Sequence, residues 1–269
     1  MTASYGKIAS IVPVAHLGEL VDDTYFMALS HLCDMNPMYM EFYKAQVDAG
    51  KHVTLDNSTV ELGHPANPDG YLENAVRMGA SQVLLPDWLY DTERTLDEGD
   101  DFLRRVEAHH YTGRLMAVPQ GRTDDEWLGC ARTMLERWPV ATLGISRRYT
   151  DYWYAKRLGA VQSLRQVCED TGHLDVRIHL LGCQDRPEWD VAPSLLLPYV
   201  QGVDGSLAAL FTMNGLFMTE GAERPQGSVD FRHTYRVGLL QKNLRCWRRL
   251  CAEGSLPMTQ RETICEDCD

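Results

Sequence analysis

The sequence predicts an α/β protein with the fold of a (β/α)₈ TIM barrel. Short apolar segments rich in Val, Ile and Leu alternate with longer amphipathic segments from one end of the chain to the other, a pattern typical of parallel βα units. The length of 269 residues is close to the ~250 residues of an average TIM barrel. Hydrophobic residues make up 44% of the chain, enough for a large core. A doubly wound open sheet is the alternative architecture.

Seven segments are expected to form buried parallel strands, because they are short, apolar and bounded by polar residues, glycine or proline. In chain order they are Ile8–Val14, His52–Asp56, Gln82–Pro86, Leu115–Pro119, Val140–Ser146, Val176–Leu181 and Tyr199–Asp204.

The longer segments between them have the amphipathic periodicity of helices. These are Pro37–Ala49, Asp69–Met78, Thr92–His109, Asp124–Trp138, Asp151–Thr171 and Glu188–Leu197. Several begin with an acidic or hydroxyl residue, which suits a helix N-terminus. No linker-like composition divides the chain, so we expect one domain over residues 1–269 with a helical C-terminal segment from about residue 228.

The last expected helix, Phe231–Ala252, is strongly basic and has no acidic residue before Glu253. Two interpretations are open, a solvated helix face or a platform for a phosphate backbone. In the second, Arg245, Arg248 and Arg249 would contact nucleic acid.

The overall charge is acidic, with a formal net charge of −12. Taken alone, this disfavours a polyanionic partner, although a local basic face can persist on an acidic protein. No apolar run approaches the length of a membrane span, and the first seven residues lack the apolar region of a signal peptide. We therefore expect a cytoplasmic protein without a membrane partner.

Four of the eight cysteines, Cys246, Cys251, Cys265 and Cys268, fall within the last 24 residues. The final pair has the Cys-x-x-Cys spacing of a zinc half-site, whereas the spacing of Cys246 and Cys251 does not place them on one helix face. A structural zinc ion and a set of free thiols are both open interpretations.

Polar residues follow several of the predicted strands at their carboxyl ends, where the active site of a TIM barrel lies. Asp56, Asp87 and Asp204 supply carboxylates and Gln120 a carboxamide. Two carboxylates can act as nucleophile and proton carrier at a sugar anomeric carbon. A third carboxylate beside a carboxamide suits the N1–H and exocyclic amine of a guanine ring.

An ordered set of motifs resembles the tRNA-guanine transglycosylases over roughly residues 8–210. The motifs are Leu55-Asp56-Asn57-Ser58, Pro86-Asp87, Val118-Pro119-Gln120-Gly121, Leu143-Gly144-Ile145, His179-Leu180-Leu181-Gly182 and Gly202-Val203-Asp204. The chain is shorter than the tRNA enzymes and is similar to the phage-type branch, which exchanges guanine in DNA for a 7-deazaguanine. This resemblance implies a phage protein that acts in the cytoplasm of the host.

The resemblance also implies roles for individual residues. Asp56 would handle protons and Asp204 would be the nucleophile that holds a covalent glycosyl intermediate. The family has its nucleophile three residues after the aspartate of its Val-Asp motif, where this chain has Leu207. The remaining pocket residues would bind the base: Asp87, Gln120, Gly144, Leu181, Gly182 and Ser58.

The expected partners are DNA and a free 7-deazaguanine such as preQ0, with Arg147 and Arg148 close to the phosphates. The chemistry needs no cofactor. Alternatives are a transglycosylase acting on RNA, a barrel glycoside hydrolase or small-phosphate enzyme that uses the same acids, and a DNA-binding protein without catalysis. A monomer and a homodimer are both open.

Overall fold

A computed structural model of the chain describes residues 7–152, 156–183 and 186–253. Its eight strands form one sheet in which every neighbouring pair is parallel. The strands are β1 (Ile8–Ser10), β2 (Tyr25–Leu29), β3 (His52–Asp56), β4 (Gln82–Leu84), β5 (Arg114–Ala117), β6 (Thr142–Ser146), β7 (Arg177–Leu181) and β8 (Val200–Gly205).

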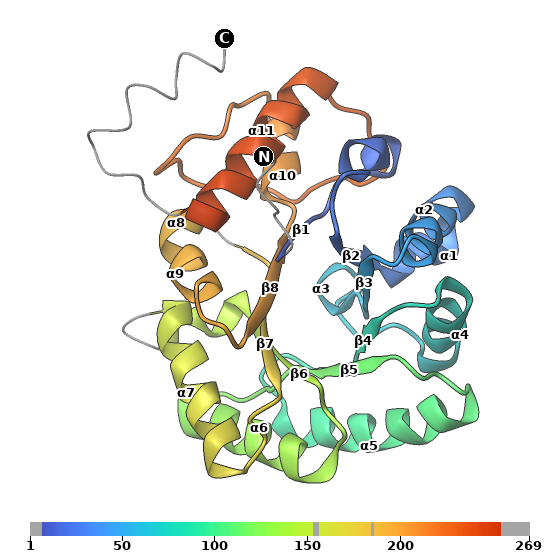
Figure 1. Cartoon of the computed structure of the whole chain (residues 1–269), viewed down its shortest axis with the longest axis vertical. Helices are drawn as coiled ribbons and strands as arrows, with labels where there is room; N and C mark the ends of the chain where they lie inside the picture. The colour runs from blue at the N-terminus through green and yellow to red at the C-terminus, as the bar shows by residue number, and fades with distance from the viewer. Residues whose placement is uncertain (1–6, 153–155, 184–185, 254–269) are drawn as a thin grey trace.

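The sheet curves into a nearly closed barrel (Figure 1). The hydrogen-bonded order runs β1-β8-β7-β6-β5-β4-β3-β2, and β1 lies next to β2 where the ends of the sheet meet. The prediction of a (β/α)₈ TIM barrel is thereby confirmed, and the doubly wound sheet is excluded.

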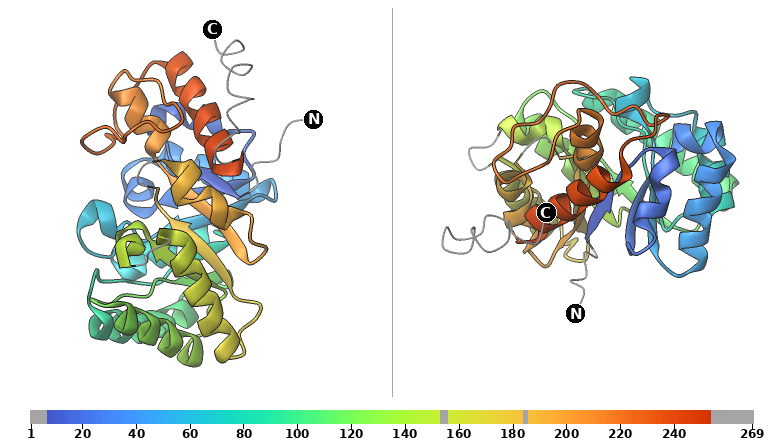
Figure 2. Two further views of the ribbon diagram at one scale, coloured as in Figure 1. Left: turned by 90° about the vertical axis from the view of Figure 1, so that its left-hand side faces the viewer. Right: turned by 90° about the horizontal axis from the view of Figure 1, so that it is seen from above.

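Helices surround the strands on the outside of the barrel (Figures 1 and 2). The helical elements are η1 (Val14–Leu20), α1 (Ser30–Met35), α2 (Pro37–Asp48), α3 (Thr59–Leu62), α4 (Pro68–Met78), α5 (Thr92–Ala108), α6 (Asp124–Arg137), η2 (Arg147–Tyr152), α7 (Lys156–Asp170), α8 (Pro187–Asp190), α9 (Ala192–Leu195), α10 (Leu207–Met213) and α11 (Val237–Glu253). None of the helices in the described ranges combines the length and the hydropathy that crossing a bilayer requires.

The predicted helix Glu188–Leu197 is divided into α8 and α9. Pro193 lies in the first turn of α9 and has no N–H to continue a helix from α8. The first strand was predicted to extend to Val14, but β1 ends at Ser10. The chain turns from there into the 3₁₀ helix η1, which Pro13 precedes.

The sequence did not predict β2. Its apolar run Tyr25–Leu29 continues without a turn signal into α1, where Leu32 and Cys33 are also buried. The periodicity of apolar residues therefore does not mark where the strand ends and the helix begins. Pairing with β3 over all five residues defines the strand in the structure.

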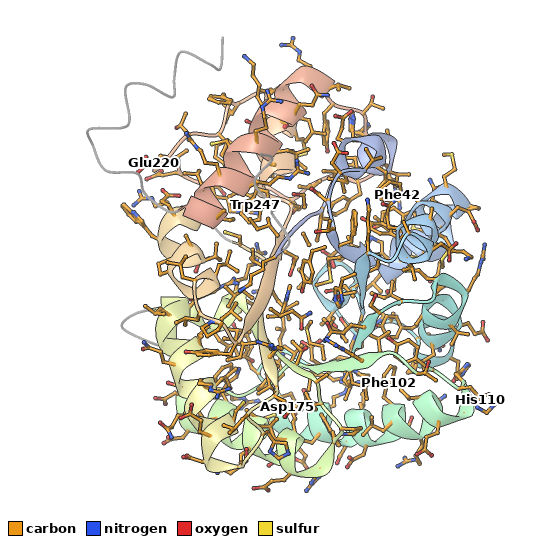
Figure 3. The ribbon with its side chains drawn as sticks, viewed as in Figure 1. Phe42, Phe102, His110, Asp175, Glu220 and Trp247 are labelled. Atoms are coloured by element: carbon orange, nitrogen blue, oxygen red, sulfur yellow. The ribbon has the colours of Figure 1, made fainter. Side chains whose placement is uncertain are left out.

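The C-terminal helix α11 is amphipathic and packs on the barrel. Leu240, Leu244 and Trp247 belong to the same hydrophobic core as the strands, and Trp247 is entirely buried (Figure 3). A Cβ atom on Gly205 would lie 3.0 Å from the Trp247 ring, so glycine at the end of β8 lets the helix approach closely. The helix begins at Val237 rather than Phe231, because residues before it bind η1 instead: the Val14 N–H donates to the Phe231 carbonyl and the Tyr235 N–H to His16 Nε2.

Candidate active site

A cleft of about 670 Å³ lies at the carboxyl ends of the strands, a volume in the range of small-molecule sites. Its lining comes from residues at or just after β1 to β8, and from residues 224 and 228–232 of the long connection between α10 and α11. That connection is held against η1 at Val14 and His16. The cleft is therefore built from segments more than 200 residues apart in the sequence.

Five carboxylates line this cleft: Asp56, Glu61, Asp87, Asp204 and Asp230. Three of them were predicted from strand ends, on β3, after β4 and on β8. Glu61 comes from α3, in the polar connection that follows β3. The structure thus brings the three predicted aspartates to one cavity.

Burial raises the pKa of Asp56 well above its usual range, and the nearby charges of Glu61 and Asp204 raise it further. The N–H of Ser58 donates to Asp56 Oδ1 and opposes that shift. The pKa of Glu61 is also raised, first by burial, while Arg147 lowers it. A carboxyl group in this environment is suited to carry a proton near neutral pH.

Asp87 is 6% exposed and accepts three hydrogen bonds from side chains. Oδ1 accepts from Asn57 Nδ2 at 2.9 Å and from Thr59 Oγ1 at 3.2 Å, and Oδ2 accepts from Gln120 Nε2 at 2.7 Å. Burial raises the pKa of Asp87 to about 6, although all three donors favour the charged form. A carboxylate has about four acceptor positions, so about one is left for a ligand.

Gln120 is entirely buried and lies behind Asp87, outside the lining of the cleft. Its Oε1 accepts hydrogen bonds from the Tyr149 hydroxyl and from the Tyr90 N–H. In this arrangement Gln120 orients Asp87 rather than facing the cavity.

Asp204 is 6% exposed and accepts two hydrogen bonds at the same oxygen. The Gly182 N–H lies 3.0 Å from Oδ1 and His179 Nε2 lies 3.1 Å from it. Oδ2 has no hydrogen-bond partner among the described residues. One oxygen is therefore fixed, and the other is available for chemistry.

Four arginines line the same cleft: Arg147, Arg148, Arg224 and Arg232. The charges of Arg148 and Arg224 lower the pKa of Arg147, after the larger effect of burial, so these three guanidinium groups lie close together. The first two were predicted to contact phosphate; the others come from the connection to α11. An acidic centre beside a basic side suits a ligand that has both a reactive sugar and phosphate groups.

Of the six residues predicted to bind the base, three line the cleft (Asp87, Leu181 and Gly182) and three do not (Gln120, Gly144 and Ser58). Gly144 lies below it, where a Cβ atom would meet the side chains of Leu181 and Val118. Ser58 is buried with a left-handed φ of 58°, and its Oγ contacts His31 Nδ1 at 2.9 Å instead of the cavity.

The three predicted arginines of α11 lie outside the cleft lining. Arg248 forms an ion pair of 2.7 Å with Asp23, and the side chains are only 14% and 6% exposed. The pair links α11 to the connection before β2. Arg245 is exposed and Arg249 is half-buried, so of the three only Arg245 has the accessibility of a surface contact.

The candidate zinc ligands are only partly described. Cys246 and Cys251 are buried in α11, and burial raises the pKa of the Cys251 thiol well above its usual range. Cys265 and Cys268 lie outside the described residues. Within the described ranges, no three His, Cys, Asp or Glu side chains are arranged to hold a metal ion.

Sequence reasoning missed several residues of the cleft. Glu61 and His31 follow β3 and β2 by a few positions, and Arg224 and Arg232 come from the connection to α11. Burial lowers the pKa of His31, which favours a neutral ring. The polar composition of residues 57–68 was a usable signal for Glu61, whereas nothing local in residues 214–236 indicates that they reach the cleft.

Comparisons with known proteins do not assign the chain to a family. No protein-family model matches the sequence, and no curated protein matches it with significance.

Proposed function

We propose that the protein is a base-exchange transglycosylase that replaces guanine in DNA with a 7-deazaguanine through a covalent intermediate on Asp204. The observation that carries the proposal is the convergence of Asp56, Asp87 and Asp204 in one cleft with four arginines. The resemblance of the strand-end motifs to guanine transglycosylases supplies the reaction class.

In the first step, Asp204 Oδ2 attacks the anomeric carbon of the target nucleotide. The bond from that carbon to the purine N9 breaks, and its electron pair leaves with the base. The departing base takes a proton from Asp56, whose raised pKa favours a protonated carboxyl before the reaction. The sugar is then held as an ester of Asp204.

In the second step, the incoming 7-deazaguanine loses its N9 proton to Asp56, and N9 attacks the same carbon. The bond to Asp204 breaks and its electron pair returns to the carboxylate. Because each displacement inverts the anomeric carbon, two of them preserve the configuration.

Base recognition is assigned to Asp87. Its ionised form accepts a hydrogen bond from the N1–H or the exocyclic amine of the purine, using the acceptor position left beside Asn57, Thr59 and Gln120. The buried position strengthens this bond relative to one in water.

The arginine side of the cleft is assigned to the phosphates that flank the target nucleotide. The base must leave the helical stack to enter a cavity of this depth. Arg147, Arg148, Arg224 and Arg232 would then compensate the charge of the backbone beside the opened position.

The test is to incubate the protein with guanine-containing DNA and preQ0, and to analyse the nucleosides by mass spectrometry. In parallel, a denaturing gel detects a protein–DNA adduct. Wild type is expected to exchange the base and form the adduct, and Asp204→Asn to do neither. Asp48→Asn, an exposed acid at the end of α2, is the control and is expected to behave as wild type.

The other outcomes separate the alternatives. Exchange in tRNA but not in DNA would assign the RNA reaction, and release of the base without insertion would indicate a hydrolase. DNA binding without either reaction would leave a non-catalytic binding protein. Exchange by Asp204→Asn at the wild-type rate would refute the assignment of the nucleophile.

A further inference from the structure

Asp204 is the end of a chain of buried hydrogen bonds that runs through the barrel interior. His179 Nε2 lies 3.1 Å from Asp204 Oδ1, and His179 Nδ1 lies 2.8 Å from the Tyr25 hydroxyl. Gln201 Nε2 in turn donates to the Tyr25 hydroxyl at 3.0 Å. His179 is entirely buried and Tyr25 is 5% exposed.

The donors and acceptors along this series of hydrogen bonds fit the following arrangement of protons. An ionised Asp204 can only accept, so His179 Nε2 must carry a hydrogen. In a neutral ring Nδ1 is then an acceptor, which takes the hydroxyl proton of Tyr25. The Tyr25 oxygen accepts from the amide of Gln201, so every contact pairs a donor with an acceptor.

The far end of the chain is itself fixed. Gln201 Nε2 also donates to Gln82 Oε1 at 2.7 Å, and Gln201 Oε1 accepts from the Thr142 hydroxyl at 2.7 Å. These contacts fit an amide whose nitrogen faces Tyr25 and Gln82 and whose oxygen faces Thr142. The Tyr25 ring is further held by stacking on His52, with centroids 4.9 Å apart and planes at 6°.

An irregularity in β8 makes the arrangement possible. Ile178 pairs with Val200 and His179 with Gly202, so one extra residue, Gln201, lies between the two pairs. Such a bulge changes which side chains face inward. Gly202 faces Tyr25, since a Cβ atom there would lie 2.9 Å from the ring, and Gln201 and Asp204 also reach interior partners.

We infer that His179 is a positioning residue for Asp204, held in the Nε2–H tautomer by Tyr25 and Gln201. The inference rests on the proposed function for the role of Asp204 as nucleophile. His179 and the Gly182 N–H fix Oδ1, so that Oδ2 is directed to the anomeric carbon. Fixing an attacking group in its reactive orientation is a recognised source of rate.

The first experiment measures the tautomer directly and needs no activity. Long-range ¹H–¹⁵N spectra of the full-length protein with ¹⁵N-labelled histidine distinguish protonated from unprotonated ring nitrogens. The His179 ring is expected to be protonated at Nε2 alone in wild type. In Tyr25→Phe, Nδ1 loses its donor, and a mixture of tautomers is expected. Tyr111→Phe removes another largely buried hydroxyl, which bonds to Ala80 instead, and is expected to leave the His179 signals unchanged.

The second experiment measures the rate of adduct formation on Asp204. Loss of one buried hydrogen bond is expected to slow the step about three- to tenfold in Tyr25→Phe, without a change in KM for the base. His179→Phe is expected to slow adduct formation more than His179→Gln does, because the glutamine amide can place a donor near the position of Nε2. Tyr111→Phe again serves as the control.

The outcomes separate the two claims. An Nδ1–H tautomer of His179 in wild type, or a Tyr25→Phe variant with unchanged tautomer and unchanged adduct rate, would overturn the positioning role even if exchange occurs. The expected tautomer and its response to Tyr25→Phe, found together with no adduct in wild type, would support the arrangement around Asp204 and refute the proposed function.

Discussion

At the scale of single residues, the acids of the cleft have different environments, and the difference matters more than their number. Asp204 is fixed at one oxygen by two donors, whereas Asp56 is half-buried near the charges of Glu61 and Asp204. The raised pKa of Asp56 suits the proposed role of acid. Asp204 suits the proposed role of nucleophile because only its Oδ1 is bound by the two donors.

Asp87 provides a prediction about stability. Its pKa rises from about 3.9 in the unfolded chain to about 6 in the folded protein. The folded state then binds the proton more tightly, so the unfolding free energy falls as the pH rises from about 4 to 6. Asp87→Asn removes this dependence. The variant should gain stability relative to wild type by about 2 kcal/mol between pH 4.5 and pH 7.5.

Urea denaturation at the two pH values, followed by tryptophan fluorescence, measures the change. The prediction concerns how the difference in unfolding free energy between variant and wild type changes from one pH to the other. A hydrogen bond that the substitution weakens equally at both pH values does not affect that change. A constant offset between variant and wild type at both pH values would contradict the raised pKa of Asp87.

Gly202 gives a second prediction at this scale. An alanine Cβ would lie 2.5 Å from the Lys7 carbonyl and 2.9 Å from the Tyr25 ring. The Lys7 backbone directly precedes β1 and cannot move without disturbing that strand. We expect Gly202→Ala to lower the unfolding free energy by about 1–3 kcal/mol, measured by thermal or urea denaturation. Gly238→Ala, at a position with open space in α11, should be neutral or stabilising by up to about 1 kcal/mol. Equal effects of the two changes would show that β8 is not packed as described.

At the scale of elements, α11 combines a buried apolar face with basic residues of two kinds. Arg248 is bound to the buried Asp23, and Arg245 is exposed. The pattern of charges in the sequence could not separate them, because both belong to the same basic run. Their accessibility depends on which side of the helix faces the connection before β2.

This difference predicts opposite results for two similar substitutions. Arg248→Gln leaves Asp23 buried without its partner and should cost about 3 kcal/mol of unfolding free energy. Arg245→Gln should change it by less than about 0.5 kcal/mol. Urea denaturation of both variants is the measurement. A cost for Arg245→Gln as large as that for Arg248→Gln would contradict the packing of α11.

At the scale of the whole molecule, the net charge of −12 and the basic side of the cleft have opposite effects on a polyanionic ligand. The acidic surface repels a polyanion at long range, and the arginines attract it only near the opening. The proposed binding to DNA should therefore be strongly dependent on salt and confined to the cleft.

The double variant Arg224→Gln/Arg232→Gln tests this localisation. If both arginines contact phosphates, the slope of log affinity against log salt should become less steep by roughly 1.4–1.8, the lower value for single-stranded and the higher for double-stranded DNA. Fluorescence anisotropy with labelled DNA at several salt concentrations provides the slope. A matched pair on two outer helices, Arg104→Gln on α5 and Arg132→Gln on α6, should leave the slope unchanged. A similar change in slope for that pair would place DNA elsewhere on the surface.

The sequence by itself determined the barrel architecture, seven of its strands and three acids of the cleft. These features are local: the periodicity of apolar residues defines a βα unit, and a strand end places its polar residue at the carboxyl edge of the sheet. Only the tertiary structure decided that β2 is a strand, that Gln120 lies behind Asp87, that residues 224 and 228–232 reach the cleft, and that Arg248 pairs with the buried Asp23. Each of these depends on contacts between segments distant in the chain, such as the hydrogen bond from Val14 to Phe231 and the extra residue of β8. Local sequence patterns do not specify such contacts, because they form only when the barrel brings its first and last strands together.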